Sequence, residues 1–297
     1  MNHLRSSRGH VLPMLVLALI SLATPLRAAG VQLHDDLGRI TEWSSPPQRI
    51  ITMLPSLTET VCELGACDKL VGVDRYSNYP EQVKTLPKLG GLDDSNIEAI
   101  VALRPDVVLA ASSSRIGERL AGLGVKVVTL DTKSHEDVQR VLGKVGVLLG
   151  VADAQRVWRH IDAGVGAAAQ SLPPEARGVL VYYEVDSAPY AAGESSFMGQ
   201  TLKRLGARNI IPAAMGPFPK INPEFVVRAN PQLIMIGQRH LAALYKRPGW
   251  EQIDALRKQH VCIFSPEESD VLTRPGPRMA QGAQIMASCL RTMSAAR

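Results

Sequence analysis

The sequence predicts an α/β protein in which mostly parallel strands fall into two sets, before and after one long helix. Short β-branched runs recur along the chain, and each is followed by a turn and a helical pattern. Continuous apolar runs that alternate with helices are typical of parallel sheets covered on both faces. A long helical segment in the middle and a likeness between the two halves together indicate two similar lobes.

The first 28 residues have the order of a secretory signal peptide: a basic start, the apolar stretch "VLPMLVLALISLATPL" and the small-residue segment "RAAG". We expect cleavage after Ala28. Pro13 and Pro25 interrupt an apolar core that is shorter than the ~20 residues of a spanning helix, so an uncleaved anchor is the less favoured alternative. No cysteine follows the apolar run, which argues against an amino-terminal lipid anchor. The prediction is a protein exported to the periplasm.

Removal of this segment takes away three arginines and no acidic residue, so the formal net charge falls from +5 to +2. The basic character of the chain therefore belongs in part to the export signal. No Lys/Arg cluster interleaved with aromatic residues is present, which argues against a nucleic-acid partner.

Four runs predict strands in the first half, "RIITML", "LVGV", "DVVLAA" and "VKVVTLD", and three predict strands in the second, "GVLVYYEV", "QLIMIG" and "VCIFS". Between the two sets, apolar positions at a spacing of four form the stripe of a half-buried helix that ends before Pro173. A helix of about 20 residues is about 30 Å long, enough to connect two lobes, although one more sheet-covering helix is an alternative. The predicted boundaries are an N-terminal lobe over 29–150, a connecting helix over 151–173 and a C-terminal lobe over 174–297.

The segments "IEAIVALRPDVVLA" and "PEFVVRANPQLIMI" share one pattern: a glutamate, an apolar pair, a polar break, a proline and a buried strand. This similarity indicates that the two lobes are related by an approximate duplication.

Cys62, Cys67, Cys262 and Cys289 suit an exported protein, in which disulfides persist. Four cysteines allow three connectivities, and the sequence does not choose among them. We expect Cys62 to pair with Cys67 and Cys262 with Cys289, because each pair lies within one predicted lobe.

The sequence lacks the common signatures of catalysis. The sequence contains no phosphate-binding G-x-x-x-x-G-K-[ST], no G-x-G-x-x-G after a strand and no G-x-S-x-G elbow. The histidines are far apart, which argues against a compact metal site. We therefore predict a binding protein without catalytic activity, and keep an exported α/β hydrolase using a serine of 112–114 or 195–196 as the alternative from another class.

The segments "RIITMLPSLTETVCELGA", "LVGVDRYSNYP", "IEAIVALRPDVVLA" and "RPGPR" resemble the helical-backbone substrate-binding proteins of ABC importers, which carry cobalamin, haem and ferric siderophores. The likeness is greatest to the members that bind cobalamin. It implies two Rossmann-like lobes joined by one rigid helix, a ligand between the lobes, small lobe movement, a monomer, and delivery to an inner-membrane ABC permease.

Carried over residue by residue, the resemblance implies four ligand-binding residues. Tyr76 falls on a cleft tyrosine that packs against the corrin, and Phe218 on an aromatic of the second lobe. Asp270 and Arg274 match polar residues of the last cleft loop, and of Arg274 and Arg278 one is expected to pair with a surface carboxylate. Ala111 departs from the pattern, because cobalamin-binding members have a tryptophan there.

The same residues leave the ligand open. If the ligand is haem, Tyr76 would serve as the iron ligand, with Arg75 or Arg274 favouring its phenolate. Tyr79 is interpreted as a residue that packs the loop, and Phe218 has the alternative of capping the second-lobe core. Cobalamin or a related corrinoid is the leading prediction, with haem and a ferric siderophore as alternatives.

Glu98 and Glu224 occupy the first turns of two predicted helices, Glu98 in the capping-box pattern S-x-x-E from Ser95 and Glu224 after Asn222. The helix dipole alone would explain both. The resemblance places them at the two lobe tips, where they would dock onto arginines of the permease.

Overall fold

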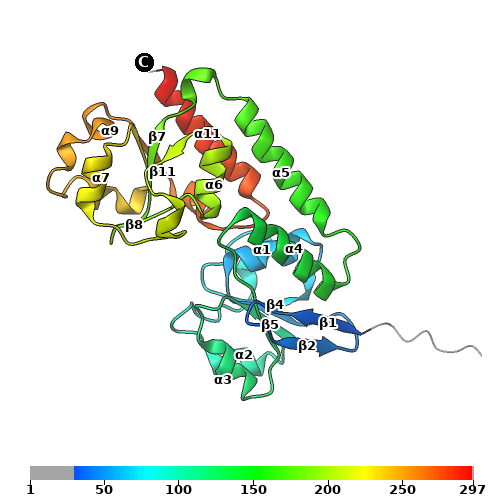
Figure 1. The fold of residues 1–297 in the computed structure, drawn as a ribbon. Helices are drawn as coiled ribbons and strands as arrows, with labels where there is room; N and C mark the ends of the chain where they lie inside the picture. The colour runs from blue at the N-terminus through cyan, green and yellow to red at the C-terminus, as the bar shows by residue number, and fades with distance from the viewer. Residues whose placement is uncertain (1–29, 296–297) are drawn as a thin grey trace, which may run out of the picture.

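The computed structural model describes residues 30–295, and these form two lobes joined along one side by a long helix (Figure 1). The expected signal peptide and its cleavage after Ala28 lie outside the described residues. Both lobes combine a largely parallel sheet with helices, which confirms the predicted fold class.

The sheet of the first lobe has four parallel strands in the order β4-β3-β5-β6. Its strands are β3 (Ile50–Thr52), β4 (Leu70–Val73), β5 (Val107–Ala110) and β6 (Val127–Thr129). The helices of this lobe are α1 (Pro55–Glu63), α2 (Ile97–Ala102), α3 (Ile116–Ala121) and α4 (His135–Leu149), with short 3₁₀ turns η1 (Cys67–Lys69) and η2 (Glu81–Thr85).

Neighbouring residues of these strands enter different cores. Ile50 packs with α1 and α4 on one face, whereas the next residue, Ile51, packs with α2 and α3 on the other. Both are fully buried. This two-sided burial explains why the strands appear in the sequence as continuous apolar runs.

The sheet of the second lobe has the order β11-β10-β7-β8, with β9 also paired to β7, and only the β7/β8 pair is antiparallel. Its strands are β7 (Leu180–Asp186), β8 (Tyr190–Ala191), β9 (Arg208–Asn209), β10 (Leu233–Gly237) and β11 (Val261–Phe264). Its helices are α6 (Phe197–Arg204), α7 (Pro223–Ala229), α8 (Leu241–Leu244), α9 (Asp254–Arg257), α10 (Pro266–Thr273) and α11 (Met279–Ala295). The 3₁₀ turns are η3 (Pro174–Ala176), η4 (Ala213–Met215), η5 (Gln238–His240) and η6 (Trp250–Gln252).

The connection between the lobes is helix α5 (Gln155–Gln170), which is shorter at both ends than the expected helix over 151–173. Gly150 ends α4 in the left-handed conformation, and the residues after it form a turn rather than the start of α5. At the other end, Pro173 disfavours helical geometry in the residue before it. Helix α11 packs along α5, and Gly164 lets Ala280 approach so closely that an added Cβ would lie 2.5 Å from it.

One hydrophobic core continues through both lobes. The same cluster of buried residues contains Ile50 of the first sheet, Ile161 of α5 and Val181 of the second sheet. The shared core joins the two lobes over a broad apolar contact, beyond the chain connection itself.

The antiparallel pair β1 (Val31–His34) and β2 (Ile40–Trp43) was not predicted. Val31, Leu33 and Trp43 are buried in the shared core, and β1 packs on α4. The alternating burial of β1 follows the period of two expected for a strand with one solvated face.

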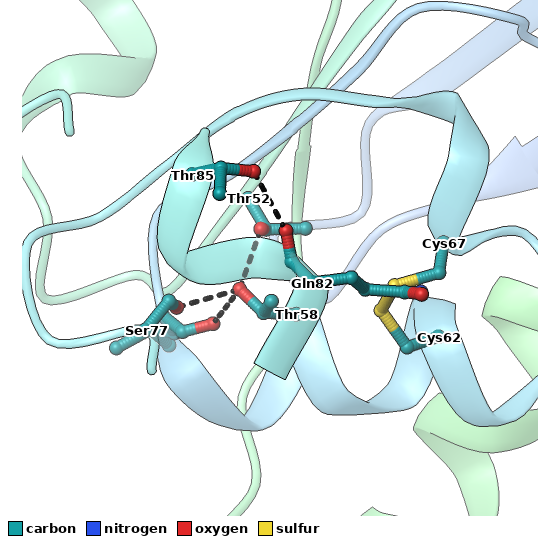
Figure 2. Close-up of a disulfide and its surroundings, with 8 residues drawn as sticks. Thr52, Thr58, Cys62, Cys67, Ser77, Gln82 and Thr85 are labelled. Carbon is teal, nitrogen blue, oxygen red and sulfur yellow. Dashed lines mark hydrogen bonds between the residues drawn. A yellow bond between two sulfur atoms is a disulfide. The ribbon is translucent and has the colours of Figure 1, made fainter. Parts of the chain in front are cut away.

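The structure brings the cysteines together in the two expected pairs. Cys62 and Cys67 have a Cα–Cα distance of 4.0 Å, at the end of α1 (Figure 2), and Cys262 and Cys289 have one of 6.0 Å, between β11 and α11. The second pair closes the longer loop, and loop-closure entropy then gives it about 3.5 kcal/mol of stabilisation, against about 2 kcal/mol for the first.

His135 lies at a contact between the lobes, at the start of α4. Its Nε2 is 3.1 Å from the carbonyl oxygen of Phe197 and 2.9 Å from Oγ1 of Thr201, both on α6. Because a carbonyl only accepts, Nε2 carries the proton. Burial lowers the pKa of His135 from 6.5 to about 4, so the ring is neutral at pH 7.

We expect the stability of the protein to fall as the pH drops from 6.5 towards 4. In that window the unfolded chain protonates this histidine and the folded protein does not, which removes about 2 kcal/mol between pH 7.5 and pH 5. Urea unfolding at both pH values measures the loss. His135→Gln should flatten the pH dependence by this amount, whereas the exposed His160→Gln should leave it unchanged; equal pH dependence in all three proteins would contradict the assignment.

Candidate functional site

A cleft of about 490 Å³ lies between the lobes, at the carboxyl ends of the parallel strands. Ligands of open α/β sheets bind at this edge. From the first lobe it is lined by residues that follow β3, β4, β5 and β6: Leu54, Pro55, Ser56, Tyr76, Ala111, Ser113, Leu130, Asp131, Thr132 and Lys133. From the second lobe it is lined by Phe218, Arg239, Asp270, Thr273, Arg274 and Pro275.

The loop after β4 presents Tyr76 to this cleft. Asp74, which is buried, accepts hydrogen bonds from the backbone N–H of Tyr76 at 2.9 Å and from the hydroxyl of Ser77. Burial raises the pKa of Asp74, although these hydrogen bonds favour its charged form. Figure 2 shows how Ser77 continues into a chain of hydroxyls through Thr58 to Thr52, with 2.7 Å between successive oxygens. These hydrogen bonds therefore fix the backbone of the loop. The side chain of Tyr76 stays accessible to a ligand, because 62% of the residue is exposed.

Arg274 ties the same loop to the second lobe. Its guanidinium donates to the carbonyl oxygen of Tyr76 at 3.1 Å and to Oδ1 of Asn78 at 2.7 Å, and it pairs with Asp270 at 2.8 Å. Asn78 in turn donates to Asp270 at 2.9 Å. Arg274 is only 7% exposed, so its main effect at the cleft is to hold the loop that carries Tyr76.

Glu59 of α1 is the anion that both arginines of the "RPGPR" segment share. Its carboxylate is 2% exposed and lies 3.0 Å from Arg274 and 2.5 Å from Arg278. The expectation that one of these arginines pairs only with a surface carboxylate is wrong, because both contact the buried Glu59; Arg274 has the half-buried Asp270 as a second partner. The cluster links the first lobe to the segment before α11.

Phe218 lines the same cleft as Tyr76, from the second lobe. Its ring packs edge-on against Phe197 with 6.1 Å between centroids, and it also lines the cleft. Phe218 can therefore contact a ligand and pack against the second-lobe core at the same time, so the two alternatives given for this residue do not exclude each other. The four residues predicted to bind ligand, Tyr76, Phe218, Asp270 and Arg274, come together in one cleft.

Other predicted residues take different places. Tyr79 does not line the cleft; its ring lies under the guanidinium of Arg278, 4.3 Å from the ring centroid, beside a second cavity of about 240 Å³. Arg75 pairs with Asp94, and its guanidinium carbon is 5.9 Å from the ring centroid of Tyr76. Ala111 forms part of the cleft wall.

Glu98 and Glu224 are both exposed, in the first turns of α2 and α7. The capping box expected from Ser95 is wrong, because Asn96 caps α2 and accepts from the N–H of Ala99 at 2.9 Å. Asn222 caps α7 and accepts from the N–H of Glu224 at 2.9 Å.

Sequence reasoning missed Lys133 and Arg239 as cleft residues. Lys133 follows β6 and Arg239 follows β10. Each is the second residue after a predicted strand, and this position was the signal that could have found both.

One serine of each cluster, 112–114 and 195–196, is engaged in hydrogen bonds within the fold. Ser112 bonds to Asp131, and Ser196 caps α6 by accepting from the N–H of Gly199. No serine of either cluster forms a hydrogen bond with a histidine within residues 30–295. In that same range no cluster of side chains suited to a metal ion is present, and no helix is long and apolar enough to cross a membrane.

Comparison with known proteins agrees with this geometry. The family model for periplasmic binding proteins matches residues 50–267. A vitamin B12-binding protein from Vibrio vulnificus is 28% identical over 246 residues, 79% of this chain and 87% of the relative. An uncharacterised ABC transporter substrate-binding lipoprotein from Bacillus subtilis is 29% identical over 275 residues, 88% of this chain and 85% of the relative. The structure of a periplasmic haem-binding protein from Pseudomonas aeruginosa has a TM-score of 0.68 and 28% identity, covering 83% of this chain and 93% of that one.

Two α/β lobes with a cleft between them, at the carboxyl ends of both sheets, define a substrate-binding protein of the ABC transporter type. This chain belongs to the periplasmic binding protein family that also includes vitamin B12-binding and haem-binding members.

Proposed function

We propose that this protein is exported to the periplasm, captures cobalamin or a related corrinoid between its lobes, and delivers it to an inner-membrane ABC permease. The observation that carries the proposal is that Tyr76 and Phe218, one from each lobe, line the same cleft. Two aromatic faces suit a large flat ligand, and the polar groups around them fix its orientation. The protein binds and carries its ligand as a monomer, without changing it chemically.

Haem is the second candidate, and a specific feature of the cleft favours it. The phenol oxygen of Tyr76 makes no hydrogen bond to any residue of the range 30–295, so it is open to coordinate iron. Ala111 also leaves the wall of the cleft without the aromatic ring expected in a corrinoid site.

We expect Tyr76→Ala to weaken ligand binding by at least about tenfold, because it removes one of the two aromatic faces. The measurement is an absorbance titration of the purified mature protein with cyanocobalamin and, separately, with hemin. Tyr76→Phe keeps the ring and removes the oxygen. It should retain cobalamin binding but lose a tyrosinate-haem spectrum, so the pair of variants separates the two ligands.

Tyr245→Ala is the matched control, because Tyr245 is 63% exposed and lies outside the residues that line the cleft. It should bind as the wild type does. If Tyr76→Ala also binds as the wild type does, the cleft is not the ligand site.

We further propose that Glu98 and Glu224 contact the permease. Each is exposed at the start of a helix, and α2 and α7 lie in different lobes on the side of the molecule away from α5 (Figure 1). Among residues 30–295, the Glu224 side chain makes only a distant ion pair of 3.7 Å with Arg228. Two acidic side chains on separate lobes would form ion pairs with basic residues of the permease, and so fix the orientation of the binding protein on it.

A further inference from the structure

The charged side chains that line the interlobe cleft fall into two groups. Asp131 accepts from the backbone and hydroxyl of Ser112, and Asp270 is held by Asn78 and Arg274. These carboxylates are therefore engaged by the protein. By contrast, the side chains of Lys133 and Arg239 make no ion pair or hydrogen bond with any residue that the structure describes.

Lys133 and Arg239 approach the cleft from opposite lobes. Lys133 follows β6, and its backbone is fixed on both sides: its N–H donates to Asp137 at 3.0 Å and its carbonyl accepts from Phe197 at 2.7 Å. Arg239 lies in η5, directly after β10. Both residues are exposed, and both line the cleft.

Unpaired cations beside a cleft concentrate negative charge there, and low-dielectric walls strengthen the effect. Ammonium and guanidinium groups form their strongest hydrogen bonds with carboxylate and phosphate oxygens. We propose that Lys133 and Arg239 together bind an anionic substituent at the edge of the ligand, and so determine which metal chelates the protein accepts. This inference rests on the proposed function and adds the charge of the ligand to it.

Two sources can supply this anion. Cyanocobalamin carries one phosphodiester, which dicyanocobinamide lacks. Haem carries two propionate carboxylates, which are neutralised in hemin dimethyl ester. Each pair therefore provides a ligand with the anion and a counterpart without it.

The test measures affinities of the purified mature protein for all four ligands. The variant Lys133→Gln/Arg239→Gln removes both cations, and Arg119→Gln/Lys203→Gln is the matched control. The control also removes one arginine and one lysine, one from each lobe, both exposed and outside the cleft lining. Cobinamide differs from cobalamin in more than charge, so the decisive quantity is how the variant changes the ratio of affinities within a pair.

In the pair that the wild type binds, we expect the anionic member to lose about tenfold or more in affinity in the Lys133/Arg239 variant. The uncharged counterpart should change by less than about twofold, and the control variant should change neither. The loss should shrink at high salt, because exposed charges are screened.

Equal losses for both members of the pair, or no loss for the anionic member, would overturn the inference while leaving the proposed function intact. If the wild type binds none of the four ligands, the proposed function itself fails, and this inference fails with it. The two failures are therefore distinguishable from the wild-type titrations alone.

Discussion

Reversal of both exposed glutamates, Glu98→Arg with Glu224→Arg, is expected to abolish ligand uptake by cells while leaving ligand affinity within about twofold of the wild type. The reason is electrostatic: two contacts with basic permease residues would each become a repulsion, and like charges placed together cost several kcal/mol. Each single reversal should give an intermediate rate. Uptake of labelled cyanocobalamin, or of haem, in a strain that carries the cognate permease measures the effect.

The structure explains why this change should leave the fold intact. Neither glutamate is buried, and their only contribution to stability within the described residues is at helix N-termini and in one weak surface pair. Such terms are worth about 0.3 to 1 kcal/mol each. Neither residue lines the cleft.

The matched control reverses two other exposed glutamates, Glu118→Arg with Glu175→Arg, one before and one after α5. Its net charge equals that of the test variant, so a general effect of charge would impair both. Normal uptake by the test variant, or impaired uptake by the control to the same degree, would rule out docking through these two positions.

The strands could be predicted where burial on both faces leaves a continuous apolar run. "LVGV" corresponds to β4 without a shift, and "VCIFS" exceeds β11 by one residue. The hairpin β1/β2 and the two-residue strands β8 and β9 were missed. Their residues alternate between buried and exposed or are too few to form a pattern, and their pairing is decided by contacts elsewhere in the chain.

In the candidate site, too, local features could be predicted from the sequence and contacts between distant residues could not. Tyr76 could be placed because it follows a predicted strand on a loop rich in turn residues. The buried cluster of Glu59, Arg274 and Arg278 could not, because its partners are 215 and 219 positions apart and the sequence does not reveal which acid meets which base. The local sequence pattern therefore predicts the loop that carries Tyr76, whereas the ion-pair partners of Glu59 follow only from the tertiary structure.

Removal of the Glu59 carboxylate is expected to have the largest effect on stability. Glu59→Gln leaves two cations, Arg274 and Arg278, in a contact where their exposed fractions are 7% and 14%. Breaking a buried ion pair by removing one partner costs about 3 to 5 kcal/mol, because the remaining charge stays desolvated. Urea or thermal unfolding of the purified protein at pH 7 measures the loss.

Glu63→Gln is the control for this prediction, because Glu63 lies one turn further along α1 and is exposed. It should change the free energy of unfolding by less than about 0.5 kcal/mol. Ligand affinity should also fall in Glu59→Gln, because Arg274 holds the carbonyl of Tyr76 and would lose its fixed position.

A second substitution separates charge from packing. In Glu59→Gln, the added change Arg278→Gln removes one of the two stranded cations, while Arg274 keeps Asp270 as a partner at 2.8 Å. The double variant should therefore lose less stability than the two single variants added together, with a coupling of about 0.5 to 3 kcal/mol. Strict additivity would show that Glu59 acts through packing alone. A clear coupling would establish that the buried carboxylate of Glu59 and the guanidinium of Arg278 stabilise each other, and so join the lobe that carries Tyr76 to the other lobe.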